Sequence, residues 1–247
     1  MERTCTVYGV AAGSFPSAAW RNDGRHEDRR HMTPDWLIDR FDALDCDPEV
    51  LRGDHDLNPG MGILPDLTPA AVLIPLVERE TELTTLFTQR TSHLKHHAGQ
   101  ISFPGGHSDP EDTSAEDTAL RETEEEVGLH RSRIRVIGRL APYITRTGFS
   151  VIPVVGLVTP PFDIEPDPHE VEDVFEVPLN FLMDPANHQR HKREVNGTRR
   201  DFYAMPYQER FIWGATAGMV KNLYDVLVGD GPDPNFRRDF QGARPAP

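Results

Sequence analysis

Residues 103–129 read FPGGHSDPEDTSAEDTALRETEEEVGL and join a glycine turn to a glutamate-rich segment. Residues three and four positions apart share one face of a helix. Three glutamates therefore converge on one face of the predicted helix: Glu122, Glu125 and Glu126. Another face presents side chains that can pack: Leu120, Thr123 and Val127. The helix is thus predicted to be anionic on one side and in contact with a core on the other.

The two ends of this helix carry local signals. Ser114 predicts the N-cap, and Asp117 three residues later complements the helix dipole. Gly128 predicts the C-terminal stop. Upstream, residues 104–106 form a predicted Pro-Gly-Gly turn, where the absence of side chains lets backbone N–H groups approach a ligand.

The anionic face allows two interpretations. Two charges about 4 Å apart repel by roughly 4 kcal/mol at an effective dielectric constant of 20, but a solvated helix surface relaxes most of this repulsion. An isolated Glu-rich helix is therefore usually a hydrated acidic face. If the face is enclosed, a hard divalent cation removes the repulsion, and carboxylate oxygens suit Mg²⁺ and Mn²⁺. The adjacent glycine turn and the marked helix start favour the metal site.

The spacing also resembles a known motif. Gly106, five residues, Asp112, eight residues and then RETEEEVGL resemble the Nudix box of the Nudix hydrolase superfamily. In that box, Gly, five residues, Glu and seven residues precede REUxEExGU, where U is a bulky aliphatic residue. The chain departs from it by Asp112 in place of Glu, by one extra residue before Arg121, and by Thr123 at an aliphatic position. The helix half keeps its arginine, glutamates and glycine in register.

A second motif lies immediately upstream. Residues 86–106 read LFTQRTSHLKHHAGQISFPGG and are similar to the additional motif of coenzyme A pyrophosphatases, roughly LLTxR(S/A)xxxRxxxGxxxFPGG. Three positions carry conservative replacements: Phe87, Thr91 and Lys95. Lys95 stands where the motif has arginine and cannot form the bidentate contact of a guanidinium. The similarity continues downstream in VFEVPL and FIWGATAG.

The resemblance implies a fold and an activity. The implied fold is α/β, a Nudix-type α/β/α sandwich with a mixed central sheet. The implied reaction is hydrolysis of the pyrophosphate bond of coenzyme A and its derivatives, with Mg²⁺ or Mn²⁺ as cofactor. Its products are 3′,5′-ADP and 4′-phosphopantetheine or the acyl form.

Two alternatives remain open. The helix reads the diphosphate and not the groups that flank it, so ADP-ribose, a dinucleoside polyphosphate or another nucleoside diphosphate derivative is an alternative substrate. A non-catalytic nucleotide-sensing or protein-binding module on the same fold is the other alternative, and the intact set of three glutamates speaks against it.

By the same resemblance, Glu122 and Glu126 are the expected principal metal ligands, and Glu125 is a further ligand or the general base. Arg121 is expected to orient a glutamate, which places it in the catalytic set with Glu122 and Glu125. The backbone of the glycine pair, Gly105 and Gly106, is expected to border the diphosphate.

Loops supply further candidates. Three cations are candidate substrate-binding residues: Arg90, Lys95 and Arg146. Arg90 is the strongest of them because a guanidinium binds phosphate through two hydrogen bonds. Two aromatic residues are candidates for stacking on a base: Tyr143 and Phe149. Two carboxylates are candidates for an extra metal ligand or a base: Glu170 and Glu172. For each residue taken alone, a solvated loop or ordinary packing is the simpler interpretation.

Histidines and cysteines do not form a metal motif. Four histidines cluster loosely in the sequence: His93, His96, His97 and His107. They lack the further ligands of a zinc site, so hydrogen bonding or phosphate contact is the expected role. Cys5 and Cys46 are far apart and form no CxxC pair, which disfavours both a disulfide framework and a thiolate zinc site.

The overall charge restricts the partners. The chain has 40 Asp and Glu against 26 Lys and Arg, a net charge of −14, which disfavours nonspecific binding to duplex nucleic acid. An anionic substrate must then be met by local cations. No apolar run is long enough for a membrane span, and no signal-peptide pattern is present. We therefore expect a cytoplasmic protein with a small-molecule substrate, without nucleic-acid or membrane partners, and with a homodimer as an open option.

Periodicity and turn residues divide the chain. A disordered extension and a disordered tail are expected at 1–31 and 229–247, a helix with a linker at 32–69, and the Nudix domain at 70–228. Strands are expected at 70–77, 83–89, 135–140, 151–158, 174–179, 200–205 and 210–213. Further helices are expected at 34–44 and 214–227, and loops at 45–69, 141–149, 159–173 and 184–198.

Overall fold

The computed structural model describes residues 32–44, 50–93, 98–195 and 197–228. Its helices are α1 (Pro34–Asp42), α2 (Ala115–Val127), α3 (Leu179–Leu182) and α4 (Ala215–Leu227), with 3₁₀ turns η2 (Asp54–Leu57), η3 (Arg131–Arg133) and η4 (Pro185–Asn187). Its strands are β1 (Arg52–Gly53), β2 (Thr68–Glu78), β3 (Leu83–Arg90), β4 (Ile101–Ser102), β5 (Gly105–His107), β6 (Ile134–Arg139), β7 (Tyr143–Ile144), β8 (Phe149–Val158), β9 (Val171–Pro178), β10 (Gln189–Val195), β11 (Thr198–Tyr207) and β12 (Arg210–Trp213). The predicted extension and tail lie outside the described residues. None of the described helices is both long and apolar enough to cross a bilayer.

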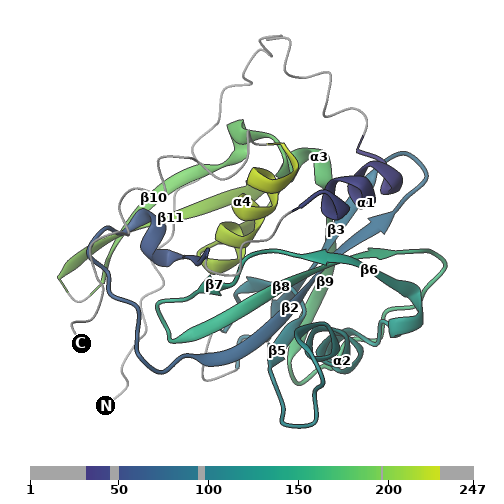
Figure 1. Ribbon diagram of the computed structural model, residues 1–247, viewed down its shortest axis with the longest axis horizontal. Coiled ribbons are helices and arrows are strands. Elements are labelled where there is room, and N and C mark those ends of the chain that lie inside the picture. The colour runs from purple at the N-terminus through teal and green to yellow at the C-terminus, as the bar shows by residue number, and fades with distance from the viewer. Residues whose placement is uncertain (1–31, 45–49, 94–97, 196, 229–247) are drawn as a thin grey trace.

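A mixed sheet of nine strands forms the centre of the fold (Figure 1). Its main path runs β1-β7-β8-β2-β3-β4, while β5, β6 and β9 pair with β2, β8 and β3. Strand β2 is parallel to β8 and antiparallel to β3. The pairing of Leu76 with Thr85 confirms the predicted hairpin between β2 and β3.

Side chains of β2 alternate between two hydrophobic cores. Ile74 and Leu76 belong to the core that includes residues of α1 and α4. Leu73 and Val77 belong to smaller cores that include residues of α2. Because successive side chains of a strand point to opposite faces, helices cover both sides of the sheet, as Figure 1 shows. The predicted layered α/β fold is therefore confirmed.

The first helix packs on the sheet through a close contact with a glycine. Helix α1 begins at Pro34, and the hydroxyl of Thr33 accepts a hydrogen bond from the N–H of Trp36. Its buried residue Phe41 lies over β6, where a Cβ added at Gly138 would be 2.6 Å from a ring atom. The glycine therefore provides the space in which this aromatic ring packs.

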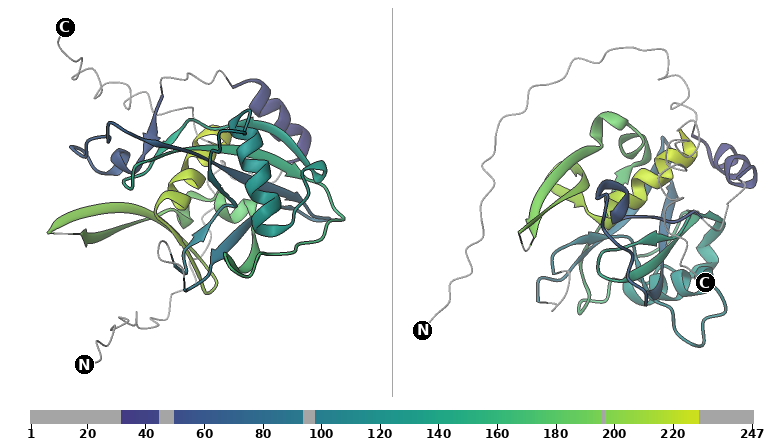
Figure 2. Two further views of the ribbon diagram at one scale, coloured as in Figure 1. Left: turned by 90° about the horizontal axis from the view of Figure 1, so that it is seen from below. Right: turned by 60° about the vertical axis from the view of Figure 1, so that its left-hand side comes forward.

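The prediction of a loop at residues 184–198 is wrong. Gln189–Val195 form β10, the edge strand of a second sheet ordered β10-β11-β12. The hairpin of β10 and β11 extends away from the rest of the protein (Figure 2). An extended edge strand is solvated along much of its length and carries charged side chains, so it lacks the apolar alternation by which strands are recognised.

Three other loop predictions are also partly wrong. The predicted linker 45–69 contains β1, η2 and the start of β2. The predicted loop 141–149 contains β7 and the first residue of β8, and the predicted loop 159–173 includes the start of β9, which begins at Val171. Strands of two residues, such as β1 and β7, form through tertiary pairing with each other and carry no period of their own.

Candidate functional site

Helix α2 has the ends that its sequence predicted. The hydroxyl of Ser114 accepts a hydrogen bond from the N–H of Asp117 at 3.2 Å. Gly128 ends the helix in the left-handed conformation, with φ of 68°, and its N–H donates to the carbonyl of Glu124. Thr123 and Val127 are buried against the sheet. Another face of the helix carries the polar side chains described next.

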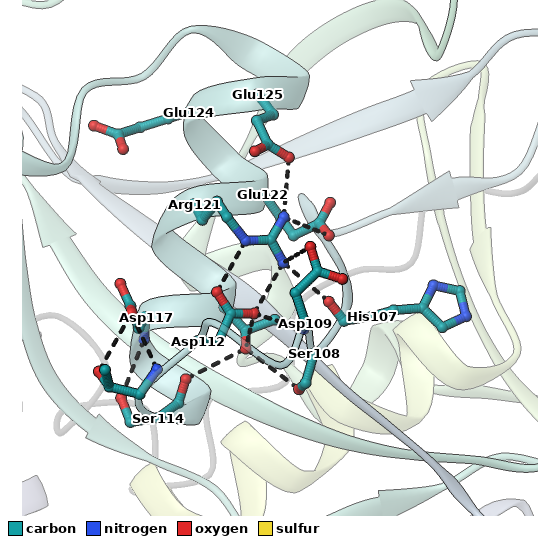
Figure 3. Close-up of polar contacts among 12 residues, drawn as sticks. His107, Ser108, Asp109, Asp112, Ser114, Asp117, Arg121, Glu122, Glu124 and Glu125 are labelled. Carbon is teal, nitrogen blue, oxygen red and sulfur yellow. Dashed lines mark hydrogen bonds and ion pairs between the residues drawn. The ribbon is translucent and has the colours of Figure 1, made fainter.

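Arg121 lies at the centre of a carboxylate cluster (Figure 3). Its guanidinium donates two hydrogen bonds of 2.9 Å to the carboxylate of Asp112. A third nitrogen donates to Glu122 at 3.1 Å and to Glu125 at 3.0 Å. The carbonyl of His107 accepts a further hydrogen bond at 3.1 Å. Hydrogen bonding with Asp112 raises the pKa of Arg121 and lowers that of Asp112 well below its usual range.

The departures from the predicted motif are structurally accommodated. Asp112, despite its short side chain, reaches Arg121 with both oxygens and also accepts a hydrogen bond from the Thr118 hydroxyl at 2.8 Å. Thr123 is fully buried, and its hydroxyl donates to the carbonyl of Ala119 at 2.6 Å. A threonine therefore fits at the aliphatic position because its one polar group is satisfied.

Glu126 is the most enclosed carboxylate of the helix. Its side chain is 5% exposed, against 19% for Glu122 and 59% for Glu125. The N–H of Gly105 donates to Glu126 at 3.2 Å, and the guanidinium of Arg90 lies 3.4 Å away. Burial raises the pKa of Glu126 to about 7 and also raises the pKa of Glu122. Two desolvated carboxylates on one helix face are the situation in which a cation is most favourable.

Gly105 and Gly106 lie directly against Glu126 and Glu122. A Cβ added at Gly106 would be 2.5 Å from the carboxyl carbon of Glu122, and one added at Gly105 would be 2.4 Å from the carbonyl oxygen of Ala71. Both glycines belong to β5, not to the predicted turn. The N–H of Gly105 donates to Glu126, and the border that the glycine backbone would form with a diphosphate stays a prediction.

A loop carboxylate joins this group from another part of the chain. The N–H groups of Glu165 and Asp167 donate to the carbonyls of Val127 and Glu126, which fixes the loop on the end of α2. The carbonyl of Glu170 accepts a hydrogen bond from the N–H of Thr91, and its carboxylate lies 3.6 Å from Arg90. Glu170 therefore belongs to the glutamate group, whereas Glu172 is exposed on β9.

The other predicted substrate contacts do not lie among the glutamates of α2. Tyr143 is 4% exposed and its hydroxyl donates to Asp54 at 2.8 Å, so the prediction that it stacks on a base is wrong. Phe149 packs edge-on against His107. Arg146 is exposed in the turn between β7 and β8. Lys95, together with two of the clustered histidines, His96 and His97, lies outside the described residues.

The donor chemistry of the site fits a hard cation. Glu122 and Glu126 offer carboxylate oxygens on the enclosed side of α2, and the charge of Glu122 contributes, after burial, to the raised pKa of Glu126. In the part of the chain that the structure describes, no three Asp, Glu, His or Cys side chains already form a ligand set. Mg²⁺ usually takes one or two protein carboxylates and completes its shell with water and substrate phosphate, so two glutamates are sufficient.

The raised pKa of Glu126 predicts a pH dependence of stability. Its pKa of about 7 in the folded protein exceeds its ordinary value of 4.5. Between these values the folded state binds a proton that the unfolded state has lost, so the free energy of unfolding falls as pH rises through this window. The shift corresponds to about 3 kcal/mol. Urea unfolding in EDTA should show this decline between pH 4.5 and 8 and a smaller decline for Glu126→Gln. Parallel pH profiles for the two proteins would contradict the prediction.

This chain matches a protein-family model and is similar in sequence to individual known proteins. The family model described as NUDIX domain matches residues 67–196. The uncharacterized Nudix hydrolase NudL of Yersinia enterocolitica is 43% identical over 154 residues, which cover 62% of this chain and 78% of that protein. NudL of Yersinia pestis is 42% identical over 154 residues, covering 62% and 77%. The crystal structure of the Nudix hydrolase RenU from M. smegmatis aligns with a TM-score of 0.44 and 17% identity, covering 68% of this chain and 91% of that one.

Proposed function

Because this chain belongs to the Nudix hydrolase family, whose members act on nucleoside diphosphate derivatives, we propose that its substrates are coenzyme A and its derivatives. Hydrolysis of their pyrophosphate bond would give 3′,5′-ADP and 4′-phosphopantetheine or its acyl form. One observation carries this choice of substrate. Two residues from separate parts of the segment that resembles the coenzyme A motif, Arg90 and Gly105, both contact the buried carboxylate of Glu126. The segment that carries this motif is thus in contact with the helix that carries the proposed metal ligands.

Glu122 and Glu126 are the residues that would hold Mg²⁺ or Mn²⁺. The bound cation would supply Lewis acidity and lower the pKa of a water molecule. Around it, the N–H of Gly105 fixes one oxygen of Glu126, and Arg121 holds Glu122. These contacts restrict both carboxylates to one geometry before substrate arrives, which is the condition for efficient transition-state stabilisation.

Two carboxylates are candidates for the base that accepts the proton of the attacking water. Glu125 is exposed and hydrogen-bonded to Arg121, so it is accessible to solvent and oriented. Glu170 lies beside Arg90, with its carboxylate 3.6 Å from the guanidinium. Arg90 itself is shared between Glu126 and Glu170, and a substrate phosphate would compete with these carboxylates for its guanidinium.

Incubation with a substrate panel tests the proposal. The full chain should cleave coenzyme A in the presence of Mg²⁺ or Mn²⁺, and mass spectrometry should identify 3′,5′-ADP and 4′-phosphopantetheine, with no product in EDTA. Cleavage confined to ADP-ribose or dinucleoside polyphosphates would contradict the choice of substrate. Saturable nucleotide binding without any metal-dependent product would instead indicate a binding module. A cytoplasmic location and a homodimer stay predictions.

A further inference from the structure

The turn between β7 and β8, residues 145–148, lies close to the carboxylate cluster of α2. Arg121 donates a hydrogen bond to the carbonyl of His107. The ring of His107 contacts the ring of Phe149, with centroids 5.2 Å apart, and Phe149 directly follows the turn. The carbonyl of Gly148 accepts a hydrogen bond from Thr68 at 2.8 Å. The turn is therefore connected to Arg121 through two residues, His107 and Phe149.

A single carboxylate, that of Asp54, holds this turn at two points. One oxygen accepts a hydrogen bond of 2.8 Å from the hydroxyl of Tyr143, and the other accepts one of 2.9 Å from the backbone N–H of Arg146. The two donors are three residues apart: Tyr143 lies in β7, just before the turn, and Arg146 lies within it. Hydrogen bonds to a charged acceptor are stronger than neutral ones, so Asp54 restricts the path of the backbone between them.

Asp54 is itself fixed by segments on both sides of the matched family region. The side chain of Asn58 donates to the carbonyl of Asp54 at 2.6 Å, and Gly53 pairs with Ile144 across β1 and β7. One residue before that glycine, Arg52 donates to Asp225 of α4 at 2.9 Å. Residues before 67 and after 196 therefore hold the backbone around Asp54 in place.

The hydroxyl of Tyr143 reaches Asp54 only because α4 carries a glycine. A Cβ added at Gly218 would lie 2.2 Å from this hydroxyl oxygen. Gly218 is the last residue of the FIWGATAG segment. The segment therefore packs against the same Tyr143 hydroxyl that Asp54 binds.

From these contacts we propose that Asp54 is a positioning residue that fixes the 145–148 turn and thereby sets selectivity for the group attached to the diphosphate. The inference rests on the proposed function. Arg146 is exposed on the turn, and its N–H is one of the two groups that Asp54 holds. Releasing the turn would change where this guanidinium lies without touching the glutamates of α2. Substrate affinity, and not the chemical step, should respond.

Two substitutions at Asp54 test the proposal. Asp54→Ala removes both hydrogen bonds, and we expect KM for coenzyme A to rise about tenfold while kcat changes less than about twofold, as for loss of uniform binding. Asp54→Asn can still accept from the Arg146 N–H and donate to the Tyr143 hydroxyl, so KM should return towards that of the wild type. Asp66→Ala, at an exposed carboxylate, is the matched control and should leave KM unchanged.

A second readout does not depend on activity. Hydrogen exchange of the Arg146 amide should be faster in Asp54→Ala than in the wild type and slow again in Asp54→Asn. Should Asp54→Ala fail to fold, Tyr143→Phe removes one of the two contacts and should raise KM by a smaller factor. Unchanged exchange, an equal KM in Asp54→Ala, or a loss confined to kcat would overturn the proposal. If the wild type hydrolyses no substrate, the proposed function fails, and amide exchange alone decides the positioning role.

Discussion

Replacing Glu126 by Gln is expected to lower turnover by about 100-fold or more while the fold persists. The amide keeps the size of the side chain, and its oxygen can still accept the hydrogen bond from Gly105. What is lost is the negative charge of the most enclosed carboxylate on α2. Metal affinity should fall together with kcat, because a neutral amide is a weaker ligand for Mg²⁺ than a carboxylate.

The measurement needs both activity and stability. Turnover is followed with the substrate that the wild type cleaves, at saturating and at limiting Mg²⁺, and the melting temperature is recorded in EDTA at pH 8. There the variant should be at least as stable as the wild type, since it no longer buries a charge. Glu124→Gln is the matched control, because Glu124 lies on the same helix but is bonded to Arg131. Wild-type turnover by Glu126→Gln would remove Glu126 from the metal site.

The parts of the fold that the sequence predicted best are those with local signals. Ser114 and Gly128 mark the two ends of α2 by capping chemistry, which depends only on neighbouring residues. The apolar runs of β2 and β8 identify two adjacent, mostly buried strands of the central sheet. The glutamates of α2 could likewise be placed on one face from helical spacing alone.

The parts that escaped prediction depend on distant partners. Strand β10 is charged because it is an edge strand of a hairpin that extends from the protein, so its sequence resembles a loop. Residues 104–106 were expected to form a turn, but Gly105 and Gly106 belong to β5, which pairs with the distant strand β2. Asp54 lies in a 3₁₀ turn without a motif, and its contacts with Tyr143 become visible only in three dimensions.

Arg121 is the second position at which we expect a substitution to have a large effect on activity. Its guanidinium is shared among the carboxylates of Asp112, Glu122 and Glu125 and the carbonyl of His107. These groups come from α2, from β5 and from the intervening loop. One side chain therefore holds the loop against the helix and keeps two of the glutamates in place.

Arg121→Lys is accordingly expected to lower kcat/KM by about 100-fold, because an ammonium group has no planar fork and cannot hold Asp112 through two bonds while binding Glu122 and Glu125. Arg131→Lys is the control, since Arg131 pairs with Asp117 and Glu124 elsewhere on α2. Steady-state kinetics with the substrate of the wild type measures the effect.

A double-mutant cycle with Asp112→Asn separates orientation from simple loss of charge. If Arg121 acts by tying Asp112 to the helix, each single variant breaks the same contact and the combined loss should fall well short of the product of the two. Multiplicative losses would mean that the two residues act independently. Arg121 would then influence turnover through Glu122 and Glu125, independently of its contact with Asp112.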